Sequence, residues 1–287
     1  MSKISKITIF IILILPILFY GWRISLRSPR TNIQQQLFPG VTYERKAFSE
    51  PRRFVSHIIK IDLSKSSVQP VVTNLNKYKE DDGTFAMTAS EFIRKYDVDI
   101  AINASFFYPF SEDTPWNYYP NSGDLVYPLG ESIINGQRYG NTSDKRNVLC
   151  FLRSNSAQIP LTQSCPQNTW QGISGMQMLL ENGKNVAEDS PAYARVAVGI
   201  DRKGDKLWLV LVDGKQPYYS EGITLKELAD ILVSLGCDRA INLDGGGSTT
   251  LAVKQNNKVT VLNAPIHTKI PMRERPVANH LGFKITF

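Results

Sequence analysis

Three adjacent glycines that directly follow a short apolar strand constrain this chain more than any other feature. Residues 240–243 (AINL) read as a buried strand, and Asp244 then precedes the glycines 245–247. Without Cβ atoms, such a turn can adopt positive φ values and bring backbone N–H groups close to an anionic ligand. Ser248 and Thr249 add hydroxyl donors. Neither a P-loop ending nor dinucleotide-turn spacing is present, so a tight structural turn and an anion site both stay open.

Helix-start signals precede two of the expected strands. Thr88-Ala-Ser-Glu91 and Thr224-Leu-Lys-Glu227 both have capping-box spacing, in which a hydroxyl and a carboxylate satisfy exposed backbone amides. The first predicts a short helix that leads into a strand at residues 100–104. The second predicts an amphipathic helix ended by Gly236, before the strand that leads to the glycines. Both strands contain Ala-Ile-Asn, so the two units are either a diverged repeat or separate uses of one capping pattern.

Apolar patterning elsewhere predicts sheet. Residues 54–63 and 68–72 alternate and predict an early antiparallel pair, and residues 194–200 and 206–212 predict a β-hairpin. No break in composition follows Val41. We therefore expect an α+β fold, with a mixed or antiparallel β-sheet core and a few packed helices in a single domain.

Three of the apolar strands deliver a polar residue at their C-terminal ends. These residues are Asn103, Asp213 and Asp244. Rigid strands position such groups while the following loops leave room for a ligand. The three side chains are therefore expected to cluster in one site.

The N-terminus predicts a membrane segment. Residues 7–22 are almost wholly apolar, slightly short of the ~20 residues that span a bilayer. No small-x-small cleavage site follows, which favours an uncleaved signal anchor over 1–27, with a cleaved signal peptide as the alternative. Residues 28–40 are polar with two prolines and predict a tether, so the catalytic domain is expected to span 41–287.

The formal charge of +7 is not a nucleic-acid signal. Removing the five basic residues that precede Glu44, the first acidic residue, leaves 28 basic against 26 acidic side chains. A body so nearly neutral lacks the basic face that binds a phosphate backbone, and no nucleic-acid partner is expected. The five residues are Lys3, Lys6, Arg23, Arg27 and Arg30.

Cysteine and histidine give weaker signals. In an oxidising compartment Cys150 and Cys165 could close a disulfide loop and leave Cys237 unpaired, but three reduced thiols are an equal alternative. No CxxC pair occurs and no histidine has metal-ligand spacing, so no zinc site and no cofactor are expected. A hard divalent cation held by Asp244 and Asp213 remains an option.

Several segments resemble the phosphodiester glycosidase domain in order and register. Residues 102–107 are similar to an Asn-Gly-x-Phe-Phe element of that family, although Ala104 replaces a usual glycine. The resemblance extends over roughly 103–283. The other segments are 172–183, 194–200 (ARVAVGI), 212–215 (VDGK), 223–228 (ITLKEL), 241–249 (INLDGGGST) and 275–279 (RPVAN).

The resemblance implies a hydrolase that cleaves the glycosidic bond of a sugar-1-phosphodiester, such as a GlcNAc-1-phosphodiester, in envelope or secreted glycans. Its location would be extracytoplasmic, either anchored at the membrane or secreted. Asp244 is the expected nucleophile or general base, Asp213 the second carboxylate, and Arg195 and Arg275 the partners of phosphate or carboxylates. The expected substrate-binding residues are Asn103, Phe106, Asn242, Gly245, Gly246, Gly247, Ser248, Thr249 and Asn279.

Other interpretations stay open. The same fold could serve a non-catalytic glycan-binding or exopolysaccharide-assembly protein, or an amidase- or esterase-like hydrolase that uses Ser248. The aromatic-rich residues 108–140 match no family pattern and suit either a sugar-stacking loop or a loop packed on its own domain. The stereochemical outcome is open as well.

Overall fold

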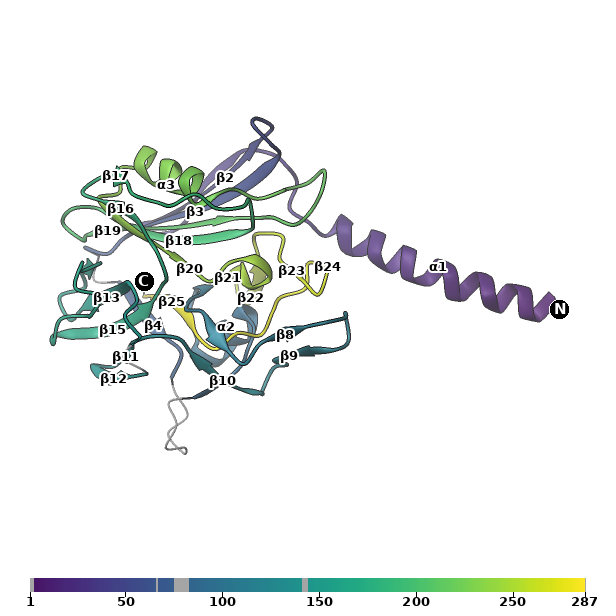
Figure 1. Cartoon of the computed structure of the whole chain (residues 1–287), viewed down its shortest axis with the longest axis horizontal. Coiled ribbons are helices and arrows are strands. Elements are labelled where there is room, and N and C mark those ends of the chain that lie inside the picture. The colour runs from purple at the N-terminus through teal and green to yellow at the C-terminus, as the bar shows by residue number, and fades with distance from the viewer. Residues whose placement is uncertain (1–2, 66, 75–82, 141–143, 287) are drawn as a thin grey trace.

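A computed structural model describes residues 3–65, 67–74, 83–140 and 144–286. The body of the protein is built from antiparallel sheets with two short helices packed on them, and a third helix, α1, extends away from it (Figure 1). The helices are α1 (Lys3–Ser25), α2 (Ala89–Tyr96) and α3 (Leu225–Ser234), with a short 3-10 turn η1 (Gly246–Ser248).

The largest sheet has eight strands in the order β1-β2-β3-β19-β18-β20-β16-β17, and every neighbouring pair is antiparallel. Its bounds are β1 (Ile33–Phe38), β2 (Val41–Phe48), β3 (Phe54–Asp62), β16 (Met178–Glu181), β17 (Lys184–Asn185), β18 (Arg195–Ile200), β19 (Lys206–Val212) and β20 (Arg239–Leu243).

A second sheet, ordered β22-β21-β6-β25-β4, faces the first. Apolar side chains from both, such as Ile59 of β3, Val198 of β18 and Ile102 of β6, form one buried cluster. Water is released when these apolar side chains are buried, so the contact between the two sheets is the main stabilising layer of the fold. The strands of the second sheet are β4 (Val68–Val72), β6 (Ile100–Asn103), β21 (Leu251–Gln255), β22 (Lys258–Val261) and β25 (His280–Ile285).

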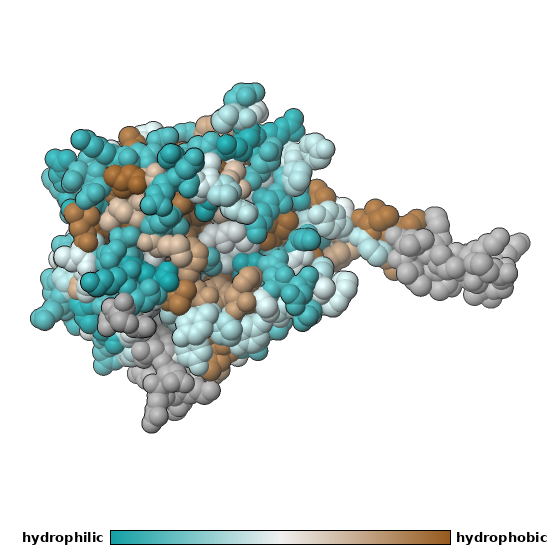
Figure 2. Space-filling model, viewed as in Figure 1, coloured by the Kyte–Doolittle hydropathy of each residue, from teal (hydrophilic) through white to brown (hydrophobic). Residues whose placement is uncertain are grey.

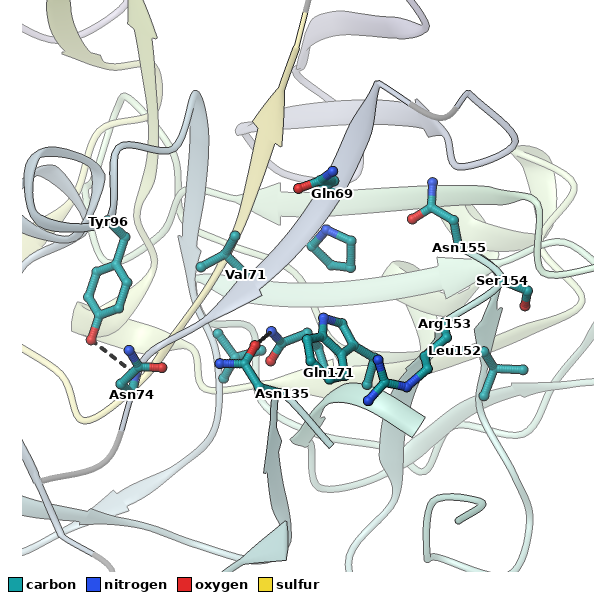
Figure 3. Close-up of a pocket in the computed structure, with 13 residues that line it drawn as sticks. Gln69, Val71, Asn74, Tyr96, Asn135, Leu152, Arg153, Ser154, Asn155 and Gln171 are labelled. Atoms are coloured by element: carbon teal, nitrogen blue, oxygen red, sulfur yellow. Dashed lines mark hydrogen bonds between the residues drawn. The ribbon is translucent and has the colours of Figure 1, made fainter. Parts of the chain in front are cut away.

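A third sheet, ordered β12-β11-β15-β13-β14, lies beside the edge strand β4. A cavity of about 690 Å³ separates β4 from β13 and β15 (Figure 3). The strands of this sheet are β11 (Ser132–Ile134), β12 (Gln137–Tyr139), β13 (Val148–Leu152), β14 (Ala157–Gln158) and β15 (Thr169–Ser174). The smaller sheets contain β5 (Thr84–Phe85), β7 (Phe107–Tyr108), β10 (Leu125–Pro128), β8 (Ser111–Glu112), β9 (Tyr118–Tyr119), β23 (Ile266–His267) and β24 (Ile270–Pro271).

The two short helices cover the outer faces of the two large sheets. Leu228 and Leu232 of α3 pack on the eight-stranded sheet, and Phe92 and Ile93 of α2 pack on the second. The fold is therefore a four-layer arrangement of helix, sheet, sheet and helix, which confirms the expected α+β class with antiparallel sheets.

Both predicted capping boxes are confirmed. The Thr88 hydroxyl accepts from the Glu91 N–H while the Glu91 carboxylate accepts from the Thr88 N–H, and Thr224 and Glu227 repeat the arrangement at α3. Gly236 follows the last turn of α3 with φ of +83°. A left-handed residue ends a helix at the lowest steric cost when it is glycine, although α2 ends on the left-handed Asp97.

Two sequence predictions on the N-terminal third are wrong. Residues 33–38, placed in a tether, form the edge strand β1 and pair with β2. The residues 54–63 and 68–72 do form strands, but they do not pair with each other. β3 lies between β2 and β19, whereas β4 pairs with β25 in the second sheet.

The helix α1 spans Lys3–Ser25. Among the described residues, no helix has both the length and the apolar character needed to cross a membrane. Several apolar side chains of the described part of α1 are exposed, and Figure 2 shows them as brown spheres where α1 leaves the body. Arg23 ties the end of this helix to the body through a 2.7 Å hydrogen bond to the Pro271 carbonyl.

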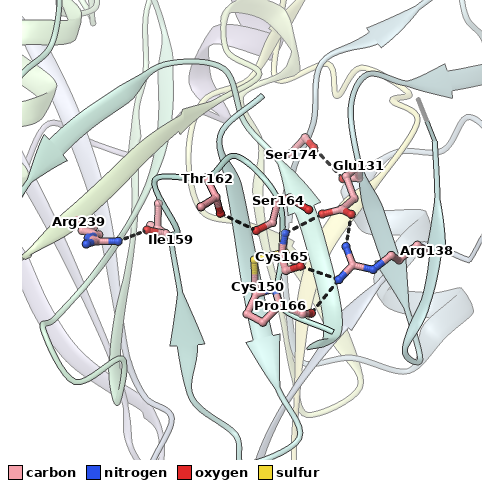
Figure 4. Close-up of a disulfide and its surroundings, with 10 residues drawn as sticks. All are labelled: Glu131, Arg138, Cys150, Ile159, Thr162, Ser164, Cys165, Pro166, Ser174 and Arg239. Carbon is pink, nitrogen blue, oxygen red and sulfur yellow. Dashed lines mark hydrogen bonds and ion pairs between the residues drawn. A yellow bond between two sulfur atoms is a disulfide. The ribbon is translucent and has the colours of Figure 1, made fainter. Parts of the chain in front are cut away.

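A disulfide joins Cys150 of β13 to Cys165, and Cys237 is free and buried. Figure 4 shows Glu131 beside the disulfide. The Glu131 carboxylate accepts from the Cys165 N–H at 3.0 Å and pairs with Arg138. Arg138 also donates to the Cys165 carbonyl at 2.6 Å. The disulfide loop is therefore fixed to the third sheet by charged side chains as well as by the covalent bond.

Candidate active site

The glycine turn joins the two large sheets. β20 of the first sheet ends at Leu243, and β21 of the second begins at Leu251. The Asn103 amide at the end of β6 holds both ends of this crossing, since it donates to the Asp244 carbonyl at 2.6 Å and accepts from the Thr250 N–H at 3.1 Å. Asn103 is buried, and its contacts are those of a residue that orders the turn rather than of one that binds sugar hydroxyls.

Each of the three glycines has its own steric reason. A Cβ on Gly245 would lie 2.6 Å from the Ala194 carbonyl oxygen, and a Cβ on Gly247 would lie 2.3 Å from Nη2 of Arg275. Gly246 has φ of +60°. The turn is thus packed against backbone on one side and a guanidinium on the other, which excludes larger residues at two of the three positions.

Asp244 stands at the start of this turn, where the residue as a whole is partly exposed but its carboxyl group is enclosed by protein groups. Burial raises the pKa of the Asp244 carboxyl to about 6, and the Ser248 hydroxyl, Arg275, the Gly245 N–H and Lys215 oppose that rise. A carboxyl group with such a pKa is ionised at neutral pH and is a stronger base than an ordinary aspartate. This is the property expected of the predicted general base.

Arg275 is the most highly connected side chain near Asp244. It is buried, donates from Nη1 to the Ser248 hydroxyl at 3.2 Å and from Nε to Nδ1 of His267 at 3.1 Å, and pairs through Nη2 with Glu112. Burial and the neighbouring arginines lower the pKa of His267 to about 3, so its ring is neutral and Nδ1 can accept. The guanidinium is therefore held in one orientation beside the glycine turn.

Two residues near the turn had been given no role by the sequence prediction. Glu112, on β8, pairs with Arg275 and accepts from the Thr268 N–H at 3.1 Å. Lys215 lies close to Gly246, since a Cβ there would be 3.6 Å from its Nζ. Lys215 was visible in the VDGK segment, whereas Glu112 lies in the aromatic-rich stretch that matched no family pattern.

Asp213, expected as the second catalytic carboxylate, is enclosed by protein groups in this structure. Its side chain has no exposed surface. One oxygen accepts from Asn263 at 3.0 Å and from the Ala264 N–H at 2.9 Å, and the other contacts His57 at 3.0 Å and Tyr219 at 3.4 Å. A carboxylate surrounded in this way has no free face for substrate, so Asp213 orders the loops beneath the site.

Three more predicted site residues make contacts within the protein. Arg195 donates to the carbonyls of Ile223 and Pro191, so its guanidinium fastens the loop before β18 to the start of α3. The amide oxygen of Asn242 accepts from the Gln177 N–H at 2.6 Å. The amide of Asn279 binds the N–H and the hydroxyl of Ser105. All three side chains shape the surrounding loops.

The remaining predicted residues surround the turn. Ser248 is buried and contacts Arg275, which does not fit the nucleophile of an amidase or esterase. Thr249 is buried, and its hydroxyl has no hydrogen-bond partner among the described residues. Phe106 is partly exposed. Within the described ranges, no group of three or more His, Cys, Asp or Glu side chains could hold a metal ion.

A family model for the phosphodiester glycosidase domain matches residues 96–284, which contain the glycine turn, Arg275 and Glu112. The chain belongs to the phosphodiester glycosidase family. This confirms the resemblance drawn from the motifs. The matched range begins at the end of α2 and omits strands β1 to β4 of the two large sheets.

Curated relatives of this domain carry one enzyme name. The chain is 37% identical over 150 residues to N-acetylglucosamine-1-phosphodiester alpha-N-acetylglucosaminidase of Bos taurus, covering 44% of this chain and 28% of that protein. It is 28% identical over 191 residues to the enzyme of the same name from Homo sapiens, covering 58% of this chain and 34% of that protein. The match spans about a third of the length of these relatives.

Solved structures share the fold. The catalytic domain of the zebrafish N-acetylglucosamine-1-phosphodiester alpha-N-acetylglucosaminidase superposes with a TM-score of 0.60 at 20% identity, covering 90% of this chain and 85% of that one. A hypothetical protein from Synechocystis gives a TM-score of 0.58 at 14% identity, covering 90% of this chain and 64% of that one. At these identities the likeness concerns the fold.

Proposed function

We propose that this protein hydrolyses the glycosidic bond of a sugar-1-phosphodiester, with an N-acetylglucosamine-1-phosphodiester as the leading substrate. The observation that carries the proposal is the Asp244 carboxylate, whose pKa is raised to about 6, at a glycine turn flanked by the cations Arg275 and Lys215. A carboxylate beside two cations suits a substrate with a cleavable sugar next to an anionic phosphodiester. Family membership and the names of the curated relatives support the same reaction.

The cations recognise the phosphodiester. Arg275 lies against Gly247 and Lys215 lies near Gly246, so a phosphodiester placed at the turn would contact both. The planar guanidinium can donate to two phosphate oxygens at once, and the lysine adds a mobile point charge. As the sugar–oxygen bond breaks, negative charge grows on the departing phosphate, and both cations stabilise it more strongly than in the ground state.

Asp244 activates the water. The ionised carboxylate takes a proton from water, the water oxygen forms a bond to the anomeric carbon, and the bond from that carbon to the phosphate oxygen breaks. The electron pair of the broken bond leaves with the phosphate monoester. Because a phosphate is a good leaving group without protonation, no strong general acid is needed.

Glu112 positions Arg275. It neutralises part of the guanidinium charge through Nη2 and is itself held by the Thr268 N–H. His267 holds Nε of the same guanidinium from another direction. These contacts fix the cation before substrate arrives, so little reorganisation is required during the reaction.

The test is release of free N-acetylglucosamine from a synthetic methyl GlcNAc-1-phosphodiester by the full chain. Asp244→Asn should lose activity by about 1,000-fold or more, because it removes the base. Asp230→Asn, on the exposed face of α3, is the matched control and should keep wild-type activity. An inactive wild type would redirect the proposal to another sugar phosphodiester or to a glycan-binding role. Equal activity in wild type and Asp244→Asn would refute the assigned base.

We also propose that the domain works in an oxidising, extracytoplasmic compartment, with residues 1–27 in contact with the membrane. Disulfides persist in such compartments, and the disulfide between Cys150 and Cys165 supports this location. Exposed apolar side chains of α1, including Phe19 and Trp22, support the membrane contact.

Thiol labelling of the protein from its native host tests the compartment. Maleimide added under denaturing, non-reducing conditions should label Cys237 alone, and labelling of all three cysteines would contradict the proposal.

Cell fractionation tests the membrane contact. The full chain should sediment with membranes after a high-salt wash, and complete recovery in the supernatant would count against it.

A further inference from the structure

The cavity beside β4 is separate from the candidate active site. Its walls are the edge strand β4, the end of β13 with the turn after it, and the start of β15. Its volume of about 690 Å³ is within the range of ligand sites. Neither Asp244 nor any residue placed around the glycine turn contributes to its lining, so a ligand there would not contact the proposed catalytic groups.

The lining combines an aromatic ring with many neutral hydrogen-bonding groups. The Trp170 ring is partly exposed, and the Arg153 guanidinium lies over it, 3.9 Å from the ring centroid. Among the residues that the structure describes, no acidic side chain lines the cavity, while five side-chain amides do (Figure 3). Amides both donate and accept, which matches the hydroxyl groups of a sugar, and an aromatic face suits the apolar face of a pyranose ring. The amides belong to Gln69, Asn74, Asn135, Asn155 and Gln171.

The oxygen atom of one of these amides lacks a hydrogen-bond partner among the described residues. Gln171 is only 4% exposed, and its Nε2 donates to Oδ1 of Asn135 at 3.0 Å. Its Oε1 is buried and accepts no hydrogen bond from the described residues. A buried acceptor left unsatisfied costs about 1–3 kcal/mol in general, so a hydroxyl donor that reaches Oε1 through a small shift of the Gln171 side chain would find a favourable partner.

The free edge of β4 argues against a peptide as the ligand. A bound peptide strand would need a continuous row of donors and acceptors along that edge. Pro70, in the middle of β4, has no N–H, and a proline in an edge strand normally turns its missing donor outward. The Val68 carbonyl is already taken by Asn155 Nδ2 at 2.9 Å. Strand addition is therefore blocked at two points of a five-residue edge.

We propose that this cavity is a second, non-catalytic binding site for a neutral oligosaccharide chain. The part of the Trp170 indole that Arg153 leaves exposed contacts a sugar ring, Arg153 holds the indole in place, and the amides of Gln171, Asn135 and Asn74 bind hydroxyl groups. The site goes beyond the proposed hydrolysis, because it would hold a glycan polymer on the domain whatever reaction occurs at Asp244.

The experiment measures binding of three neutral oligosaccharides, chitotetraose, cellotetraose and maltotetraose, to the full chain by saturation-transfer NMR and calorimetry. We expect at least one to bind, and Trp170→Ala and Gln171→Leu each to weaken that binding by about tenfold or more. Trp116→Ala is the matched control, since this tryptophan is 83% exposed and lies outside the cavity. It should bind like wild type.

Three further measurements separate this site from the active site and from misfolding. Asp244→Asn should keep full oligosaccharide binding, and Trp170→Ala should keep wild-type release of sugar from the small phosphodiester. Thermal unfolding of Gln171→Leu, which has a similar volume, checks that the fold survives. Absence of binding to all three oligosaccharides, or equal binding by wild type and both cavity variants, would overturn the proposal.

Discussion

Gly247 and Arg275 are packed so closely that a Cβ atom on the glycine would lie 2.3 Å from Nη2 of the arginine. The guanidinium cannot retreat freely, because Ser248, His267 and Glu112 hold its three nitrogens. The identity of Gly247 therefore determines where the positive charge sits. At Gly246 the nearest atom to a Cβ is the flexible end of Lys215, at 3.6 Å.

Alanine substitution at the two glycines should separate these effects. Gly247→Ala should lower kcat/KM by about 100-fold or more, because a displaced guanidinium no longer meets the phosphate. Gly246→Ala should cost about 1 kcal/mol of stability from its positive φ and lower kcat/KM much less. Kinetics and thermal unfolding of both variants check this. A Gly246→Ala enzyme as inactive as Gly247→Ala would show that conformation, rather than contact with Arg275, sets the requirement.

Glu112 should affect catalytic activity indirectly, through its ion pair with Arg275. Glu112→Gln keeps the shape of the side chain but removes its charge, so Arg275 loses its ion pair and becomes less well held. We expect kcat/KM to fall by about 10- to 100-fold, with KM for the phosphodiester rising because the phosphate is bound less well. Glu188→Gln, an exposed carboxylate between β17 and β18, serves as the control. A variant with normal KM and reduced kcat would instead place Glu112 in the chemical step.

The raised pKa of Asp244 predicts how activity depends on pH. If the ionised form is the base, kcat/KM should rise about tenfold per pH unit below 6 and level off above it, since the pKa lies at about 6. The measurement is the pH profile of sugar release between pH 4 and 8. A profile that falls with pH through this range would assign Asp244 the role of an acid instead.

The same pKa predicts an effect on stability with a definite sign. The folded-state value of about 6 lies above the usual 3.8, so between these values the folded protein binds more protons than the unfolded chain. The contribution of Asp244 to stability then falls as pH rises through this window, and its loss is complete above about pH 6. Asp244→Asn should therefore be more stable than wild type at pH 7.5, on the order of 1–3 kcal/mol, with a smaller gain at pH 4. Urea unfolding at both pH values checks the difference, with Asp230→Asn as the control on an exposed carboxylate.

The sequence predicted the features whose signals are local. The capping boxes at Thr88 and Thr224 each lie within four residues, and both helices begin where those residues indicate. The hairpin of β18 and β19 also came from neighbouring segments. The glycine turn could be recognised because three missing side chains are unusual after a strand. These signals need no knowledge of distant contacts.

Features that depend on distant partners were not predictable in the same way. β4 pairs with β25 at the other end of the chain, and the exposed residues of β1 show no alternation that would mark a strand. Glu112 meets Arg275 across 163 positions of sequence. Asn103 contacts both ends of the glycine turn, and Asp213 is linked to it through Asn263. Sequence could not tell whether these side chains face substrate or other protein groups.

Asp213 should contribute to the stability of the fold, because its carboxylate is buried and hydrogen-bonded. Asp213→Asn keeps the size of the side chain but replaces one acceptor oxygen by an NH₂ group. If that group faces Asn263 Nδ2 and the Ala264 N–H, donors oppose donors, and if it faces His57, the contact with the ring is altered instead. The first orientation leaves buried donors unsatisfied, and both orientations remove the charge that Asn263, Ala264 and His57 surround, so we expect a loss of about 2–4 kcal/mol in the free energy of unfolding. Urea unfolding measures it, with Asp230→Asn as the control.

Because the Asp213 side chain is assigned no contact with substrate, the folded fraction of the variant should keep a KM within about threefold of wild type. A stable variant with an altered KM would return Asp213 to the substrate-binding residues.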